Sequence, residues 1–424
     1  MAWIEKRGKK YRVYWDVGTP DNRKRRTESF DIKEEADQFK KKIEYETSIG
    51  LCFDPSRMTF EEYLDYWLRL HKKNLEPKTE ASYRCEIKNH IKPHLGKLKL
   101  TKLAPIHLEN YYDFIIEDGS ANLIDRQIEE LKEKQKTANP KRQKHLEKRI
   151  AKTQARVEKM REEGKGGLSS TTAKYHHRII HKALDQAMKW GMVAVNVADA
   201  VNPPKVTKKQ IEYMQKEQVT KYIDCIKGSP DYPVIAAAIF TGMRQGELLG
   251  LKWKNVDLDA GIIHVREQLQ YLPDRGFFFK PPKQNSIRDI PIPLPLNYIF
   301  RQVRKEQDKI KEIYREAEAN SKTPVGGYND IDLVFCKPDG GPVDGTKLTK
   351  RFQKLLTSND FSKIRFHALR HTFATMCRAA GMEIADIQDL LGHADISTTK
   401  NMYTHVEIEP LRKAMDKFTA YLES

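Results

Sequence analysis

Two arginines that lie far apart in the sequence are of a type that could bind one phosphodiester. Arg244 stands in TGMRQGELLGLKW and Arg370 in FHALRH. The planar guanidinium presents a fork of donors that fits the non-bridging oxygens of phosphate, and two such forks could neutralise a phosphorane. Each motif alone has a structural explanation, such as an ion pair between Arg244 and Glu247 one helical turn away. The hypothesis therefore rests on the two motifs together.

A histidine and a tyrosine near the C-terminus could complete such a site. His393 and Tyr403 lie ten residues apart in LGHADISTTKNMYTHV. Tyrosine can act as a covalent nucleophile, and phosphoryl transfer asks the protein mainly for in-line positioning and charge stabilisation. The pattern predicts that Tyr403 attacks a phosphodiester while the paired arginines stabilise the developing charge.

The charge balance indicates the class of partner. The 424 residues hold 76 Lys and Arg against 59 Asp and Glu, a formal charge of +17. Such an excess favours a polyanion through phosphate neutralisation, and nucleic acid is the first candidate. A basic membrane-surface protein is the rival, but the sequence has neither a long apolar run nor a signal segment, so we expect a cytoplasmic protein. The five scattered cysteines form no CxxC pair, which predicts reduced thiols and no bound metal.

Residues 1–50 have the pattern of a small sheet followed by one helix. Val13, Trp15 and Val17 alternate with polar neighbours, as in a half-buried strand. The opposite strand face and the basic run that follows could lie against a DNA groove, although a solvated charged sheet is an equal alternative. The DNA-binding candidates in this region are Lys10, Arg12, Tyr14, Lys24, Arg25 and Arg26.

Residues 58–202 are predicted to form an all-helical domain. Thr59 and Glu62 form a capping box before an apolar helical stripe, and apolar residues recur at helical spacing within residues 175–188. Lysines and arginines lie between these apolar positions. The DNA-binding candidates in this domain are Lys78 and Lys88.

A charged insert at residues 123–163 divides the helical domain. Apolar residues at heptad-like spacing in its two halves, which join at Asn139-Pro140, predict an antiparallel helical hairpin. Because the exterior is mixed in sign, we expect no continuous basic track for phosphates and no contact with DNA. The flanking glycines, Gly119 and Gly164, predict that the hairpin can swing.

Residues 207–424 show mixed helical and strand patterns. Helices are predicted near Ile235 and Glu247, and strands at residues 262–265 and 287–292. A last apolar stripe, which must pack in a groove, consists of Leu411, Met415, Phe418 and Leu422. The predicted fold class is therefore multidomain: a small β-sheet with a helix, an all-α domain with an inserted coiled-coil hairpin, and a mixed α+β, mainly α, domain.

These motifs resemble the tyrosine recombinase family, in particular the integrases of phages and conjugative transposons. TGMRQGELLGL resembles the family's first-arginine box, PKQNSIRDIPI the hairpin with the catalytic lysine, HALRH the second box, and LGH with MYTHV the last. Residues 1–50 look like the arm-type DNA-binding domain. TFEEYLDYWLRLHKKNLEPKTEASY and YHHRIIHKALDQAMKWGMVAVNVADAV look like parts of the core-binding domain, and residues 207–424 look like the catalytic domain with a C-terminal docking helix.

The resemblance implies a role for each residue of the site. Arg244 and Arg370 would clamp the phosphate, and Tyr403 would attack it. His367 would help to manage the proton of the nucleophile, and His393 would donate a hydrogen bond to the phosphate.

The resemblance also assigns a general acid. Lys283 would protonate the leaving 5′ oxygen, a transfer typically worth about 10² to 10⁴ in rate. Gln284 stands where the family often has threonine, so Lys280 is the alternative to Lys283. His371 is interpreted as structural.

The implied function is site-specific DNA recombination in the bacterial cytoplasm, on the chromosome or a mobile element. Strands would be cut and rejoined through a 3′-phosphotyrosyl intermediate and a Holliday junction. No ATP, metal or other cofactor would be needed, because the phosphotyrosine bond conserves the energy of the broken linkage. The implied partners are double-stranded DNA attachment sites, a homotetramer on DNA, and a directionality factor or accessory protein, with no membrane.

Two other functions share these features. A type IB topoisomerase resembles the same catalytic plan but rejoins the same strand, and the two predicted DNA-binding domains argue against it. A catalytically silent DNA-binding protein would carry the same basic charge, and the intact six-residue set argues against that. The hairpin at 123–163 has no counterpart in the simplest family members, and we expect it to contact protein and tune synapsis or direction, with a solvated spacer as an equal alternative.

Overall fold

The computed structural model describes residues 2–8, 10–17, 24–48, 58–206, 212–283, 286–320 and 327–392. The chain divides into two compact units, residues 1–208 and 209–424. Buried apolar side chains form separate main cores within residues 2–43, 58–201 and 214–369. The fold is therefore multidomain and rich in helices, with a small N-terminal sheet.

The N-terminal sheet is antiparallel and has the order β1-β2-β3. Its strands are β1 (Ala2–Arg7), β2 (Lys10–Val17) and β3 (Lys24–Phe30), and α1 (Lys33–Ser48) packs on one face. Val13 and Trp15 are buried in the core that this face forms with α1, as the alternation in the sequence predicts. The other strand face carries Arg12 and Tyr14 of β2, with Trp3 of β1 opposite Tyr14.

The next core belongs to a helical bundle. Its helices are α2 (Phe60–His71), α3 (Pro77–Glu86), α4 (Lys92–Leu95), α5 (Pro105–Lys136) and α7 (Ser170–Lys189), with short turns η1 (Lys72–Asn74), η2 (Ile87–Ile91), η3 (Leu100–Lys102) and η4 (Val197–Ala200). The predicted capping box is present, because Thr59 Oγ1 accepts the N–H of Glu62 at 3.3 Å and Glu62 Oε2 accepts the N–H of Thr59 at 2.8 Å. It starts α2, whose Leu64 and Trp67 are fully buried.

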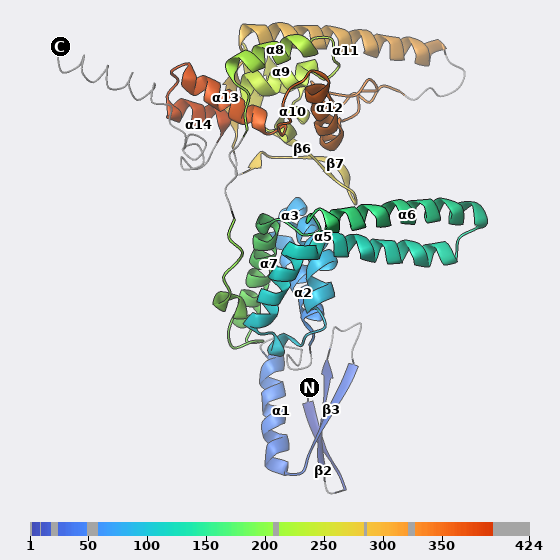
Figure 1. The fold of residues 1–424 in the computed structure, drawn as a ribbon. Helices are drawn as coiled ribbons and strands as arrows, with labels where there is room; N and C mark the ends of the chain where they lie inside the picture. Colours follow the sequence, from blue (N-terminus) through green and yellow to red (C-terminus); the bar gives the residue numbers. More distant parts are fainter. Residues whose placement is uncertain are drawn as a thin grey trace, which may run out of the picture. The chain divides into compact units, whose positions relative to one another are not determined.

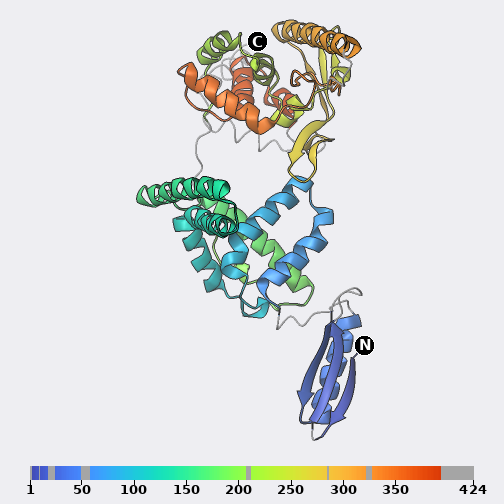
Figure 2. The ribbon, with the colours of Figure 1, turned by 90° about the vertical axis from the view of Figure 1, so that its right-hand side faces the viewer.

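The predicted helical hairpin is formed by α5 and α6 (Pro140–Glu162), which lie side by side (Figures 1 and 2). Helix α5 continues from the bundle into the hairpin without a break. Ile128, Ile150 and Val157 are buried between the two helices, with Ile124 and Leu131 packed against them. The seam therefore matches the heptad-like spacing.

The base of the hairpin is tied to the bundle by the glycine segment that follows α6. The carbonyl of Gly166 accepts the N–H groups of Ser120 and Ala121 in α5 at 2.8 and 2.9 Å, and the N–H of Leu168 donates to the carbonyl of Ile115 at 2.7 Å. A side chain at Gly167 has no room, because a Cβ there would lie 1.5 Å from the carbonyl oxygen of Ile116.

An ion-pair cluster holds the same base. Arg161 donates to both carboxylate oxygens of Asp118 at 2.8 Å and to Asp125 at 2.7 Å. These contacts argue against the expectation that the hairpin swings about its flanking glycines. Gly119 lies inside a continuous helix, and the chain that returns from Gly164 is hydrogen-bonded into that helix.

The second unit builds a mixed core around the buried helix α9. Its helices are α8 (Lys216–Ile226), α9 (Tyr232–Thr241), α10 (Gln245–Leu249), α11 (Leu294–Asn320), α12 (Gly345–Ser358), α13 (Ala368–Ala379) and α14 (Ile384–Leu391), with the turn η5 (Trp253–Asn255). One sheet has the order β4-β5-β8, from β4 (Val256–Asp257), β5 (Ile262–Val265) and β8 (Arg288–Pro291). A separate hairpin pairs β6 (Gln268–Leu272) with β7 (Gly276–Lys280). The predicted helices near Ile235 and Glu247 and both predicted strands are present.

Candidate active site

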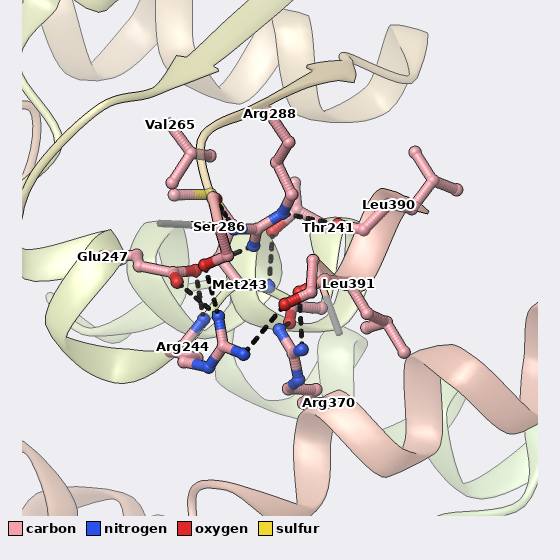
Figure 3. A network of polar contacts seen from close by, with 12 residues as sticks. Thr241, Met243, Arg244, Glu247, Val265, Ser286, Arg288, Arg370, Leu390 and Leu391 are labelled. Carbon is pink, nitrogen blue, oxygen red and sulfur yellow. Dashed lines mark hydrogen bonds and ion pairs between the residues drawn. The ribbon is translucent and has the colours of Figure 1, made fainter. Parts of the chain in front are cut away.

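Three arginines from three different elements converge in the second unit (Figure 3). Arg244 is the N-cap residue of α10, Arg288 lies on β8, and Arg370 lies in the first turns of α13. Arg370 is 2% exposed and Arg288 is 9% exposed. Burial of several cations close together is unfavourable unless anionic or dipolar groups meet them.

One carboxylate serves two of these cations. Glu247 accepts from Arg244 Nη1 and from Arg288 Nη2, each at 2.8 Å, and also from the backbone N–H of Arg244 at 3.0 Å. Burial alone would raise the pKa of Glu247, but the hydrogen bond from Arg288 and the charges of both arginines lower it below its usual range. Glu247 is therefore ionised and positions both guanidinium groups.

The C-terminal end of α14 binds all three arginines. Its last carbonyls have no partner within the helix, and a helix C-terminus attracts positive charge. The carbonyl of Leu390 accepts from Arg288 Nε at 2.7 Å, that of Leu391 accepts from Arg370 Nη2, and that of Gly392 accepts from Arg244 Nη2 at 3.1 Å.

Two glycines allow this close arrangement. Gly242 ends α9 with φ +60°, and a Cβ there would lie 2.4 Å from Phe373, while its carbonyl accepts from Arg370 Nη1 at 2.9 Å. Gly392 ends α14 with φ +64°, and a Cβ there would lie 2.9 Å from the Cβ of Ser286. The glycines of the TGMR and LGH motifs thus have a backbone reason to be glycine.

The site keeps an excess of positive charge. Three arginines meet one carboxylate among the described residues, and burial together with the charge of Arg244 lowers the pKa of Arg370 to about 9. Burial and the neighbouring cation both disfavour the charged form of this guanidinium. An anion with two negative charges would balance the cluster.

His367 lies next to this cluster, immediately before α13. Although an edge of its ring is exposed, partial burial and the charges of Arg370 and Arg244 lower its pKa from the ordinary value, so the neutral imidazole is favoured. A neutral ring nitrogen can accept a proton. The pKa of His371 is lowered to about 4 by burial and then by the charges of His367 and Arg370, and its ring meets that of His367 edge to face.

Lys283 lies in the connection between β7 and β8 rather than on a strand. Its side chain is exposed, and Ser286, three residues later, accepts from Arg244 Nη1 at 3.1 Å through its hydroxyl oxygen. This connection therefore leads directly to the arginine cluster. Lys280, the alternative, is the last residue of β7 and is half-buried.

Two residues of the predicted set cannot be placed. His393 and Tyr403 lie outside the described residues, as does the stripe of Leu411, Met415, Phe418 and Leu422. The structure thus brings together Arg244, Arg370 and His367, and it places Lys283 on an adjoining connection.

Comparison with known families decides to which one this chain belongs. Residues 207–409 match the phage integrase family, and residues 59–116 match the phage integrase N-terminal SAM-like domain. The two matches together cover more than half of the chain. The chain belongs to the phage integrase family. This integrase is a tyrosine-type site-specific DNA recombinase, which confirms the resemblance seen in the motifs.

Relatives and solved structures agree. A tyrosine recombinase XerC-like protein of Caldanaerobacter subterraneus subsp. tengcongensis is 27% identical over 423 residues, covering 95% of this chain and 94% of the relative. The Tn1549 transposon integrase in complex with transposon right end DNA matches with a TM-score of 0.61 at 20% identity, over 85% of this chain and 100% of that one. A lambda integrase tetramer bound to a Holliday junction matches with a TM-score of 0.52 at 15% identity, over 92% and 95%. At these low sequence identities, the two solved structures show that this chain has a similar fold.

The DNA-binding candidates of the N-terminal sheet divide between its two faces. On the face away from α1, Tyr14 stacks on Trp3 with ring centroids 5.3 Å apart, and Arg25 lies 5.0 Å from the Trp3 ring. Arg12 on β2 donates to Ser29. In register, Arg26 is opposite Trp15, whose side chain faces α1, so the basic run does not lie wholly on the outer face of the sheet. Lys24 is the first residue of β3. Lys10 forms an exposed ion pair with Asp31.

The two candidates in the helical bundle of this integrase are exposed. Lys78 lies in the first turn of α3 and Lys88 in η2. They share this exposure with other lysines of the bundle, such as Lys72 and Lys73.

Sequence reasoning missed Arg288 as a member of the site of this integrase. Arg288 lies within PKQNSIRDIPI, where the resemblance assigns a role to the lysine alone. The available signal was its position on a short strand in which Ile290 is buried on the same face, so that Arg288 also had to point inward.

Neither a membrane-spanning helix nor a metal-binding group is found among the described residues. None of their helices combines the length and apolar character needed to cross a lipid bilayer. The same residues contain no group of three or more His, Cys, Asp or Glu side chains that could hold a metal ion.

Proposed function

We propose that the arginine cluster binds the scissile phosphate of a DNA attachment site and that Tyr403 attacks this phosphate. The observation that carries the proposal is the convergence of Arg244, Arg288 and Arg370 at the end of α14, where a single carboxylate, Glu247, accepts from the first two. A pentavalent phosphorane carries about two negative charges, and preorganised donors stabilise it without reorganising. The net charge of the cluster is matched to this transition state.

In the proposed cleavage step, one bond to phosphorus forms, one breaks and two protons move. The Oη of Tyr403 forms a bond with phosphorus, the bond to the 5′ oxygen breaks, and Lys283 gives a proton to that oxygen. His367 takes the proton of the tyrosine, a role for which its lowered pKa and neutral ring are suited. His393 donates a hydrogen bond to a phosphate oxygen. The 5′ hydroxyl of a partner strand then attacks the phosphotyrosine and releases Tyr403. This strand exchange produces a Holliday junction.

We infer a division of labour along the chain. Residues 1–50 bind arm-type DNA, residues 58–202 bind the core site, and residues 207–424 cut and rejoin strands. The active assembly is a homotetramer on two double-stranded attachment sites in the bacterial cytoplasm, with a directionality factor as a further partner. The tetramer of lambda integrase on a Holliday junction supports this assembly by analogy.

A nicked suicide duplex built from DNA that flanks the gene tests the function. The integrase should form a covalent adduct and should bring two sites together. A silent DNA-binding protein would form no adduct, and a topoisomerase would form one without synapsis. Either result would contradict the proposal.

Changing Lys283 to alanine should slow cleavage of ordinary DNA by about 10² to 10⁴, the usual value of a proton transfer. The loss should be far smaller on DNA with a bridging 5′ sulfur, because a thiolate leaves without a proton. Single-turnover cleavage of the two substrates measures this. Lys280→Ala is the matched control, and equal slowing of both substrates by Lys283→Ala would reject the general-acid role.

Truncation after Glu409 should abolish synapsis and leave the binding of one protomer to a half-site measurable. The apolar stripe at Leu411, Met415, Phe418 and Leu422 would dock on a neighbouring protomer and couple the active sites of the tetramer. Native gel shifts on half-sites and full sites separate the two activities. Unchanged assembly on full sites would mean that the stripe packs within its own protomer.

A further inference from the structure

The charge of the α5–α6 hairpin is strongly segregated along its length. Residues 134–156, its distal part, hold nine Lys and Arg and one acidic residue, Glu147. The two parts near the base, residues 123–133 and 157–163, hold seven acidic residues against four basic ones. The distal part thus contributes +8 to a chain whose net charge is +17. Averaged over the whole hairpin, this contrast disappears.

The helix geometry of α6 gathers five of these cations on one face. At about 100° per residue, the spacing of three, four, four and four residues keeps all five within roughly 60° of one line. We call them the basic stripe; its residues are Lys141, Lys144, Lys148, Lys152 and Arg156. With a rise of about 1.5 Å per residue, the stripe is roughly 22 Å long.

Nothing among the described residues neutralises this stripe. All five side chains are exposed, and within the described ranges none takes part in an ion pair. The acidic Glu147 lies roughly 120° around α6 from the line of the stripe. The carboxylates of Asp118 and Asp125 are bound to Arg161, which lies nearly opposite the stripe.

The surface also lacks the features of a protein interface. Among the described residues, no large apolar side chain is exposed between residues 123 and 163. Interfaces between proteins usually contain buried aromatic, Met or aliphatic anchors, whereas contacts with the DNA backbone are made mainly by Lys and Arg. A straight, uncompensated row of cations on a firmly attached helix therefore fits a row of phosphates.

We propose that the basic stripe of α6 binds the phosphate backbone of duplex DNA, outside the contacts made by the active site. This inference rests on the proposed function in that DNA is the substrate. The stripe would follow about six base pairs at roughly 3.4 Å per base pair and would read no sequence. The expectation of a mixed exterior without a basic track is thereby revised, because the sign of the charge changes along the hairpin rather than from residue to residue.

The test compares two double variants of the full chain that each remove two positive charges from the hairpin. Lys148→Gln with Lys152→Gln removes the centre of the stripe. Lys132→Gln with Lys136→Gln is the matched control, because these lysines lie on α5 with the same spacing and are paired with Glu129 and Glu133 at 2.7 and 2.6 Å. Binding is measured by fluorescence anisotropy with a labelled duplex of arbitrary sequence at a series of salt concentrations.

The expected readout is the slope of log affinity against log salt concentration. Each phosphate contact contributes about 0.9 to this slope, so the stripe variant should lose about 1.8 and the control almost nothing. Equal slopes for wild type and the stripe variant would overturn the proposal, as would an equal loss in both variants. If the slopes of the wild type and the stripe variant are equal, the alternative partner of the stripe is an acidic protein surface.

A second measurement keeps this inference separate from the proposed function. The stripe variant should still form the covalent adduct with the suicide duplex once enough protein is added to saturate it. If the wild-type chain forms no adduct but the slopes still differ, the catalytic proposal fails and the DNA-binding stripe stands. If adduct formation is normal and the slopes are equal, the stripe fails alone.

Discussion

Changing Tyr403 to phenylalanine should abolish the covalent complex with a nicked duplex and leave DNA affinity unchanged. The substitution removes the nucleophilic oxygen and keeps the ring, while the phosphate-binding arginines stay in place. Denaturing gel electrophoresis detects the adduct, and anisotropy measures binding. The expected adduct yield is that of a reaction without enzyme.

A control separates the nucleophile from tyrosines in general. Tyr298 is 66% exposed on α11 of the same unit, so Tyr298→Phe should give the adduct at the wild-type level. A DNA-linked band with the Tyr403→Phe variant would identify another nucleophile and would reject the assigned site.

Changing Glu247 to alanine should destabilise the second unit by about 3 to 5 kcal/mol, the usual cost of removing one partner from a buried ion pair. Glu247 is 1% exposed, and without it Arg244 and Arg288 lose their shared carboxylate. Hydrogen exchange of peptides from α9, in the core beside the site, measures the local free energy of opening. Loss of that protection is the expected result.

Asp289 provides the matched control. It also contacts two basic side chains, Arg266 at 2.7 Å and His264 at 2.9 Å, but its side chain is 52% exposed. Asp289→Ala should cost at most about 1 kcal/mol, because solvent screens exposed ion pairs. An equally small effect at both positions would show that the carboxylate of Glu247 does not hold the arginines together.

The pH dependence follows from the lowered pKa of Glu247. A carboxyl group whose pKa is lower in the folded state stabilises the fold fully above its ordinary pKa of about 4.5, and this contribution is lost as pH falls through the lower, folded value. The Glu247→Ala variant should therefore lose less stability than wild type in acid.

The fold could be predicted from the sequence where a local pattern has one structural solution. The capping box of Thr59 and Glu62 specifies the start of α2, and the alternation around Val13 specifies the buried strand face. The long helix α11 and the β6–β7 hairpin were not predicted. The outer face of α11 mixes charged side chains with exposed Leu294 and Ile313, so its apolar residues do not mark one face, and residues 276–280 carry aromatic residues on neighbouring positions rather than in alternation.

The chemistry of the site could be predicted in kind but not in arrangement. Motif spacing selects Arg244 and Arg370 as a pair. It cannot reveal that Arg288 shares Glu247 with Arg244, because this contact forms only when β8 meets α10. Nor can it reveal that Arg370 is held by the carbonyls of Gly242 and Leu391, because these contacts form only when α13 meets the ends of α9 and α14. The basic stripe of α6 was open to prediction, since it needs only helical spacing, but averaging the charge over the hairpin concealed it.

The three carbonyls at the end of α14 couple the charge balance of the arginine cluster to the packing of this helix end. Leu390, Leu391 and Gly392 each accept from a different arginine, and the next residue in the sequence is His393. A phosphate that draws these guanidinium groups toward itself changes their hold on the helix end. By reciprocity, a change that alters how these carbonyls hold the arginines would alter the affinity of the arginines for an anion by the same factor. The end of α14 is therefore the point at which the packing of this helix and the charge balance of the cluster depend on each other.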